Sequence, residues 1–199
     1  MSIDFTKTSH IFFFGAIIPL SSWIISQWFF GIFQNWPIWL EGPSPLAVYG
    51  IIFFLFDKYG WKWKIFRDFG VVWFPNLSGR WTGKQISSYL KDDKGVEVKG
   101  SIEIRQTFSK ISVNAYYEKS DSYSATANFS KLNGEVYLYY SYDNDPSTLK
   151  QGTMQRHKGT AKIKKLPKEN AFKGFYWNSI GNSGDMEYLF DQTDLLGRL

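Results

Sequence analysis

The chain has 199 residues, a net charge of +5, two histidines and no cysteine. The lack of cysteine excludes a disulfide framework, a thiolate zinc site and a cysteine nucleophile. His10 and His157 lie in different halves of the chain, which disfavours a site built from several histidines. The positive charge is modest and fits anionic ligands or headgroups better than a nucleic-acid-binding arm.

The composition changes at Phe74–Pro75. Seven of the nine tryptophans precede Pro75, in a stretch with little charge, as in the aromatic belts of membrane interfaces. The residues that follow are polar and read as one short strand after another. We therefore expect a membrane part at residues 1–75 and a soluble ligand-sensing domain at residues 76–199.

The first apolar run, Ile11–Phe33, contains no charged residue. At about 1.5 Å per residue it extends for roughly 34 Å, which is enough to cross the hydrocarbon core. A signal peptide would have a shorter apolar region, a basic start and a small-residue cleavage site. We predict an uncleaved transmembrane helix, in which Pro19 is a candidate kink. Its polar groups, available to bond between helices, to the local backbone or to water in an assembly, are Ser22, Ser26 and Gln27, with Asn35 nearby.

The second apolar run, Leu46–Phe56, is too short to cross a bilayer by itself. It forms a second transmembrane helix if the helix continues through Tyr59–Trp63; a re-entrant or interfacial segment is the alternative. Lys58, Lys62, Lys64 and Arg67 follow this run, whereas the turn between the runs has no Lys or Arg. Positive charge favours the cytoplasmic side. We therefore expect a multi-pass inner-membrane protein with both termini and the soluble domain in the cytoplasm.

Apolar and polar residues alternate with period two in the second half, as in Val96, Val98, Gly100, Ile102 and Ile104. Turn signals, including Ser120–Asp121 and Asp143–Pro146, separate the runs. One apolar face per strand and short connections predict an eight-stranded antiparallel up-and-down β-barrel, more readily than a two-sheet sandwich. The expected strands are Gly79–Leu90, Val96–Phe108, Lys110–Glu118, Tyr123–Lys131, Glu135–Tyr142, Thr153–Lys165, Ala171–Ser179 and Asp185–Asp191.

Strict alternation directs a group of aromatic and polar side chains into one mouth of this barrel, the mouth farther from the membrane. Aromatic rings that stack on bases, with amides that read base edges, are typical of nucleotide recognition. Arg156 lies at the same height and can clamp a phosphate, although alternation directs it outward. The tyrosines can equally close the barrel end as ordinary core, and a bulge reverses the alternation on any strand. The candidate ligand-binding residues are Tyr89, Tyr117, Tyr123, Tyr142, Arg156, His157 and Asn178.

No glycine-rich phosphate loop, nucleophile elbow or metal-ligand cluster appears in the sequence. We therefore expect neither an enzyme nor a protein with a cofactor.

The order of these parts resembles a known family. Two apolar runs, an aromatic and basic linker, and the opening Leu77–Ser78–Gly79–Arg80–Trp81–Thr82–Gly83 before a barrel are similar to the Cap15-type effectors of bacterial CBASS antiphage defence. The resemblance implies that a phage-activated nucleotidyltransferase makes a cyclic dinucleotide, which the barrel binds. It further implies assembly into a homo-oligomer and disruption of the inner membrane, which kills the infected cell. The partners are then the cyclic dinucleotide, the lipid bilayer and further copies of the chain, with no DNA or RNA polymer.

Two other functions fit the same pattern. A Gly–x–Trp opening also occurs in lipocalins, so a membrane-tethered barrel that carries a lipid or another apolar ligand is the first. A scaffold that binds another protein is the second, and its surface would be the outward-facing Phe175, Trp177 and Leu189.

Overall fold

The computed structural model describes residues 8–33, 44–91, 94–146, 155–166 and 168–197. These residues form two compact units. One contains the helices up to Trp73 together with Thr107–Ser109, and the other contains Phe74–Gln106 and the residues from Lys110 onwards. Each unit is described by itself below.

A long helix opens the helical unit and confirms the first apolar run as helical. It consists of α1 (Thr8–Phe12), the π-helical turn η1 (Phe13–Ile17) and α2 (Ile18–Phe33). Ile18 donates its N–H to the carbonyl of Phe13, five residues back. Pro19 has no N–H to donate and its ring clashes with the preceding turn of a regular α-helix. The wide turn just before it accommodates the proline without ending the helix.

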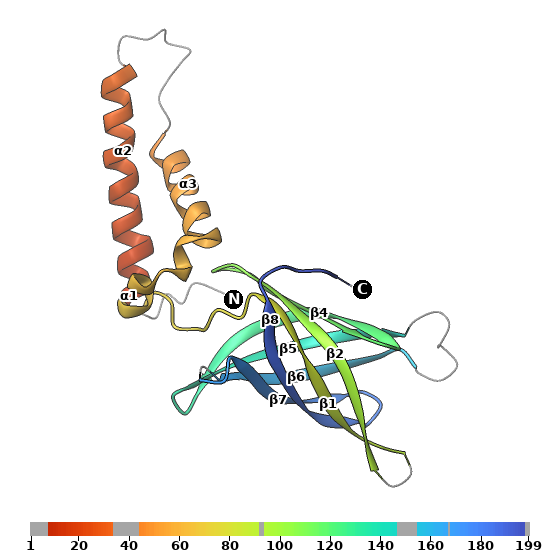
Figure 1. The fold of residues 1–199 in the computed structure, drawn as a ribbon. Coiled ribbons are helices and arrows are strands. Elements are labelled where there is room, and N and C mark those ends of the chain that lie inside the picture. Colours follow the sequence, from red (N-terminus) through yellow and green to blue (C-terminus); the bar gives the residue numbers. More distant parts are fainter. Residues whose placement is uncertain (1–7, 34–43, 92–93, 147–154, 167, 198–199) are drawn as a thin grey trace. The chain divides into compact units, whose positions relative to one another are not determined.

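The helices α2 and α3 (Pro45–Lys58) lie side by side (Figure 1). The buried face of the long helix repeats every four residues, at Phe14, Ile18, Ser22 and Ser26. Ser22 donates a hydrogen bond of 2.7 Å to the carbonyl of Ile18, so its hydroxyl is satisfied inside the helix. Small side chains here allow close approach of the helices. Gln27 is exposed, and Asn35 lies outside the described residues.

The helix α3 has 14 residues, about 21 Å of helix, and does not continue as expected. Tyr59 leaves the helical conformation, and the 3₁₀ turn η2 (Gly60–Lys62) and the short helix α4 (Lys64–Asp68) follow. Trp61, in that turn, is fully buried. The predicted extension of α3 through Tyr59–Trp63 is therefore wrong. Among the described residues, one helix, Thr8–Ile32, is long and apolar enough to cross a membrane.

The second unit is a closed antiparallel barrel in which each strand pairs with its neighbours in sequence and β8 returns to β1 (Figure 1). The predicted up-and-down barrel of eight strands is confirmed. Two expected turns are wrong, because Ser120–Asp121 begins β4 and Asp143–Pro146 ends β5. The strands are β1 (Gly79–Lys91), β2 (Lys94–Gln106), β3 (Ile111–Tyr117), β4 (Ser120–Leu132), β5 (Glu135–Pro146), β6 (His157–Leu166), β7 (Ala171–Asn178) and β8 (Ser183–Gln192).

Interior tyrosines lie directly opposite interior glycines on neighbouring strands. A Cβ atom added at Gly100 would lie 2.4 Å from the Tyr117 ring, and one at Gly159 would lie 2.3 Å from the Tyr142 ring. The missing side chain therefore leaves the space in which each ring lies across the adjacent strand. This arrangement lets an eight-stranded barrel hold several tyrosines in its interior. The four pairs are Gly100–Tyr117, Tyr142–Gly159, Tyr176–Gly184 and Gly83–Tyr188.

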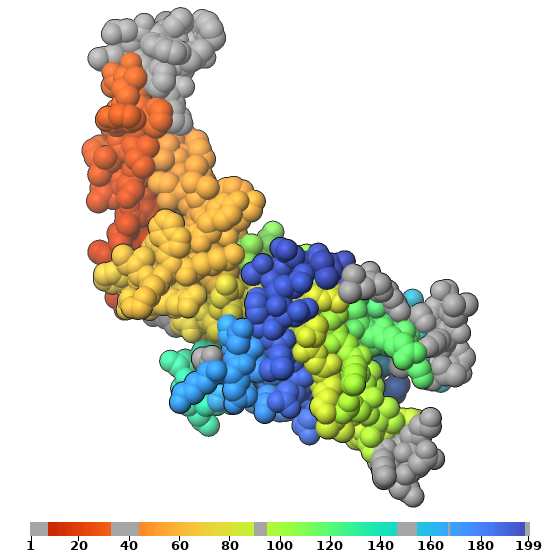
Figure 2. Space-filling model, in the orientation of Figure 1, coloured from red at the N-terminus to blue at the C-terminus, as the bar shows by residue number. Residues whose placement is uncertain are grey.

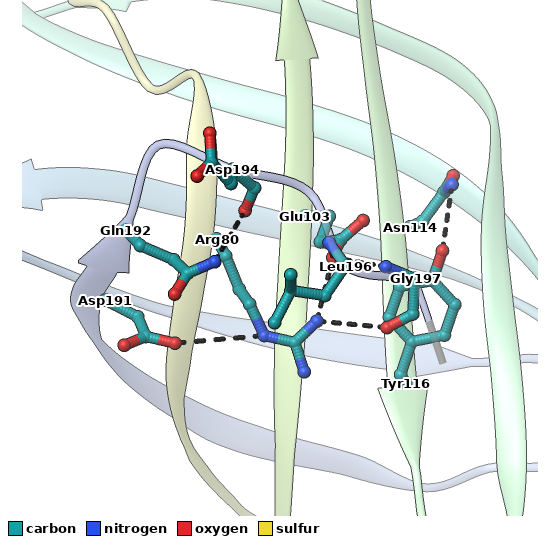
Figure 3. A network of polar contacts seen from close by, with 9 residues as sticks. All are labelled: Arg80, Glu103, Asn114, Tyr116, Asp191, Gln192, Asp194, Leu196 and Gly197. Carbon is teal, nitrogen blue, oxygen red and sulfur yellow. Dashed lines mark hydrogen bonds and ion pairs between the residues drawn. The ribbon is translucent and has the colours of Figure 1, made fainter. Parts of the chain in front are cut away.

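A polar network on the outer wall of the barrel holds the chain after β8 (Figure 3). Glu103 accepts hydrogen bonds from Arg80 (2.8 Å) and from the backbone N–H groups of Leu196 (2.8 Å) and Gly197 (2.9 Å). Arg80 in turn donates to the carbonyl of Gly197 at 3.0 Å. The dark blue C-terminal residues accordingly lie against the yellow residues of β1 (Figure 2). This strap explains why two charged residues on the outside of the barrel are buried.

Candidate functional site

The barrel interior is sealed at one end and partly exposed at the other. At the sealed end Trp81, Phe172 and Ile163 are buried, and the indole of Trp81 donates to the carbonyl of Leu77 at 2.9 Å. We call the opposite end, where odd-numbered strands end and even-numbered strands begin, the mouth. The interior positions that keep partial exposure there are Gln85, Ser87, Val96, Val98, Tyr142, His157, Asn178 and Gly184.

Tyrosine hydroxyls meet below the mouth. Tyr188 donates to the hydroxyl of Tyr117 at 3.4 Å, and Tyr117 donates to Oε1 of Gln85 at 3.3 Å. Burial raises the pKa of Tyr117 to about 12, and it also raises the pKa values of Tyr140 and Tyr142. These phenols are therefore protonated at neutral pH. The floor of the mouth is a layer of uncharged hydrogen-bonding groups, not an apolar lumen.

Three predicted site residues point into the barrel as expected. Tyr117 and Tyr142 lie opposite Gly100 and Gly159, as described above. His157 lies at the rim, opposite Asn144, and its Nδ1 hydrogen-bonds to the carbonyl of Gln155 at 2.9 Å. Because a carbonyl only accepts, this contact places a proton on Nδ1.

The inward orientation predicted for Tyr123 is wrong. The β4–β5 register shifts between Ser124 and Thr126, so alternation before this bulge is reversed relative to alternation after it. Tyr123 is 43% exposed, while Ser122 and Ser124 take the interior positions. Ser122 donates to Oδ1 of Asn144 at 2.8 Å.

Tyr89 lies at the rim of the mouth and is 60% exposed. The β1–β2 register shifts between Ser87 and Leu90, where β1 has two more residues than β2. Two extra residues leave the alternation of the flanking positions unchanged, so this shift differs from the one in β4. The role of Tyr89 in the mouth stays a prediction.

Arg156 and Asn178 have local partners. Arg156 forms an ion pair of 2.7 Å with Asp145, and its side chain is 78% exposed, which agrees with the outward direction that alternation predicts. Asn178 occupies an interior position opposite Gly159. Its Oδ1 accepts from the N–H groups of Ile180 (3.3 Å) and Asn182 (2.9 Å), so this oxygen holds the β7–β8 turn.

Gln85 lies among these interior positions of the mouth and was not among the predicted residues. It lies opposite Val98 on β2 and Met186 on β8. Period-two alternation from Trp81 places Gln85 on the interior face, so the signal was present in the sequence. Among the described residues there is no group of three or more side chains able to hold a metal ion.

A profile of the family described as "Cap15, cyclic dinucleotide receptor domain" matches residues 72–188. The chain belongs to the Cap15 family. The matched residues run from before β1 into β8, so they include the whole mouth of this Cap15-family barrel. The resemblance to Cap15-type proteins is therefore confirmed, and the barrel is a cyclic dinucleotide receptor domain.

Relatives in three bacteria share the name "CD-NTase-associated protein 15". The protein from Staphylococcus schleiferi is 27% identical over 81% of this chain and 91% of the relative. The protein from Yersinia aleksiciae is 28% identical over 70% of this chain and 65% of the relative. The protein from Escherichia albertii is 24% identical over 78% of this chain and 80% of the relative.

Proposed function

We propose that this protein is an antiphage effector that binds a cyclic dinucleotide in the mouth of its barrel, oligomerises and disrupts the bacterial inner membrane. The observation that carries this proposal is the tyrosine-lined mouth inside the matched receptor domain. Stacking of a base on an aromatic ring contributes about 1–3 kcal/mol. Tyr142, which keeps partial exposure at the mouth, is the ring for that role.

The charge distribution supports a ligand that enters base first. The interior positions of the mouth whose side chains the structure describes include no Lys or Arg, and Lys165 lies toward the sealed end, where it donates to the carbonyl of Asn76. A phosphate buried among uncharged groups would lose its hydration without compensation. The bases therefore occupy the mouth, and the phosphates stay at the rim near His157.

The same features disfavour the lipid-carrier function. An acyl chain requires a continuous apolar lumen, whereas the hydroxyls of Tyr117 and Tyr188 meet across this interior. A polar group that loses a partner to an apolar ligand costs about 1–3 kcal/mol. A nucleobase offers the hydrogen-bonding atoms that an acyl chain lacks.

Assembly needs a surface, and the outer wall over β5–β7 provides one. Phe175 and Trp177 are exposed there, with ring centroids 5.6 Å apart. Lys162 lies 4.2 Å from the ring centroid of Tyr137 and 5.8 Å from that of Phe175. Ligand drives assembly if it binds the assembled state more tightly than the single protomer.

The proposed topology has two transmembrane helices, with the barrel and both termini in the cytoplasm. The helix α3 is shorter than a typical span, and local thinning of the bilayer accommodates such a helix. The chain has no cysteine, so single cysteines report topology directly. Ser44→Cys in intact cells should react with a membrane-impermeant maleimide from outside the inner membrane, while Glu118→Cys on the barrel should not. If both positions are protected, α3 does not cross the membrane.

The central test measures binding of cyclic dinucleotides to the full chain in lipid nanodiscs. We expect saturable binding of at least one cyclic dinucleotide, a strong loss in Tyr142→Ala and little change in Tyr123→Ala. Dye release from vesicles that contain the protein should follow ligand addition. Binding of fatty acid without binding of any cyclic dinucleotide would contradict the proposal and favour the lipid carrier.

A further inference from the structure

The side-chain amide of Gln85, inside the barrel, has a hydrogen-bond partner at its oxygen, while its nitrogen can donate to a ligand. Its Oε1 accepts a hydrogen bond from the hydroxyl of Tyr117. Its Nε2 carries two N–H donors that meet no acceptor among the described residues, and the side chain is half-buried in the mouth. We propose that Gln85 reads the edge of a bound base and that it favours bases that present hydrogen-bond acceptors. This inference rests on the proposed function, because it names the specificity of the same site.

The direction of the amide follows from a directed chain of hydroxyls. Each phenol has one proton. The Tyr188 hydroxyl donates a hydrogen bond to the oxygen of Tyr117, and the Tyr117 hydroxyl donates its own hydrogen bond to Oε1 of Gln85. The amide oxygen therefore faces Tyr117, and the amide nitrogen points away from that hydroxyl.

Backbone packing holds this chain in place. Gly83 and Gly100 face each other across β1 and β2, and Tyr188 and Tyr117 lie at the two ends of this row. The two tyrosines thus reach toward each other over adjacent glycines. Tyr188 also stacks on Phe172, with centroids 5.2 Å apart and planes at 21°. Tyr117 in turn packs against Gly100, so contacts on both rings support the position of the hydroxyl that bonds to Gln85.

An amide that offers only donors discriminates between bases. A free glutamine pairs with adenine through one donor and one acceptor, at N7 and N6. Because Oε1 is directed toward Tyr117, Gln85 turns its N–H groups rather than its oxygen to a bound base, and it can give adenine only one such bond, at a ring nitrogen. Guanine presents two adjacent acceptors, O6 and N7, and uracil presents carbonyl oxygens. The site should therefore prefer a cyclic dinucleotide that contains guanine or uracil over cyclic di-AMP.

Tyr117 acts in this proposal as a positioning residue. Tyr117→Phe removes the hydroxyl that donates to Oε1 of Gln85. The amide can then rotate and turn its oxygen toward adenine. Affinity for cyclic di-AMP should then rise relative to cyclic di-GMP. A residue with a purely structural role would lower both affinities together.

The test compares dissociation constants of the full chain in nanodiscs for cyclic di-GMP, cyclic GMP–AMP, cyclic di-UMP and cyclic di-AMP. One hydrogen bond more or less corresponds to roughly a two- to tenfold change in affinity. We expect Gln85→Leu to weaken cyclic di-GMP binding relative to cyclic di-AMP by that factor. Thr82→Ala, an exposed position on the same strand, is the matched control and should leave the ratio unchanged.

The outcomes separate the two proposals. If the wild-type protein prefers cyclic di-AMP, or if Gln85→Leu binds every ligand with the wild-type ratios, the role of Gln85 is overturned while cyclic dinucleotide sensing stands. If no cyclic dinucleotide binds, the proposed function itself fails. Thermal melting of each variant identifies any loss of folding. If Tyr117→Phe does not fold, the binding ratios of Gln85→Leu decide the role of Gln85.

Discussion

Tyr142 and Gly159 face each other directly across β5 and β6, and a Cβ atom at residue 159 would lie 2.3 Å from the phenol ring. The absence of a side chain at Gly159 thus leaves the space that the Tyr142 ring occupies. The position of that ring, and with it one wall of the mouth, depends on the absence of a side chain on the neighbouring strand.

Gly159→Ala should therefore displace the Tyr142 ring and weaken ligand binding. Overpacking of an interior costs about 1–3 kcal/mol, so the melting temperature should also fall. Calorimetry and ligand titration of the full chain measure both effects. Thr160→Ala, the outward-facing neighbour, serves as the control and should bind ligand normally. Unchanged binding by Gly159→Ala would show that the ring position is not needed for recognition.

The ion pair between Arg80 and Glu103 should be needed for stability. Both residues are buried beneath the C-terminal strap, so Glu103→Ala leaves Arg80 with the longer ion pair to Asp191 (3.8 Å) and removes the acceptor for two backbone N–H groups. Loss of one partner of a buried pair costs about 3–5 kcal/mol. Urea unfolding followed by tryptophan fluorescence measures the loss.

The exposed pair between Lys84 and Glu97 joins the same two strands at 2.7 Å and provides the control. Because solvent screens this pair, Glu97→Ala should change the unfolding free energy much less than Glu103→Ala. Equal effects of the two substitutions would mean that burial under the strap adds nothing.

Stability should fall at alkaline pH because of the buried tyrosines. Burial raises the pKa of Tyr117 from the usual 10.0 to about 12. Below pH 10 the phenol is protonated in both folded and unfolded chains, and its contribution is complete. Between pH 10 and 12 the unfolded chain releases this proton and the folded chain keeps it, so stability decreases as pH rises.

Tyr117→Phe removes one of the groups responsible. The variant should lose less unfolding free energy between pH 9 and 11.5 than the wild type, whatever its stability at neutral pH. Denaturant midpoints across this range provide the measurement. Parallel pH profiles for the two proteins would indicate that Tyr117 ionises normally in the folded state.

The aromatic surface over β7 should affect assembly but not ligand recognition. Phe175 and Trp177 face outward from the strand whose interior residues include Tyr176. A Phe175→Ser, Trp177→Ser double variant should therefore form smaller oligomers on ligand addition, with unchanged binding under dilute conditions. Light scattering with added cyclic dinucleotide measures this, and Asn128→Ser on β4 is the control. Wild-type oligomer size in the double variant would exclude this wall as the assembly surface.

The sequence by itself determined the architecture of this protein. Period-two alternation determined the eight strands and their antiparallel order, because a strand buries one face whatever its neighbours are. The long uncharged run determined the first helix, and alternation correctly directed Tyr117, Tyr142 and His157 inward. These properties depend on residues close together in the chain.

Only the tertiary structure decided which side chains share the mouth. A register shift in β4 turned Tyr123 outward, since one extra residue in a strand reverses every side chain beyond it. The turn at Tyr59 ended α3 early, and the C-terminal strap buried Arg80 and Glu103 on an outer face. The contact between Tyr117 and Tyr188 depends on two glycines aligned across strands, and that alignment is a property of pairing between distant segments.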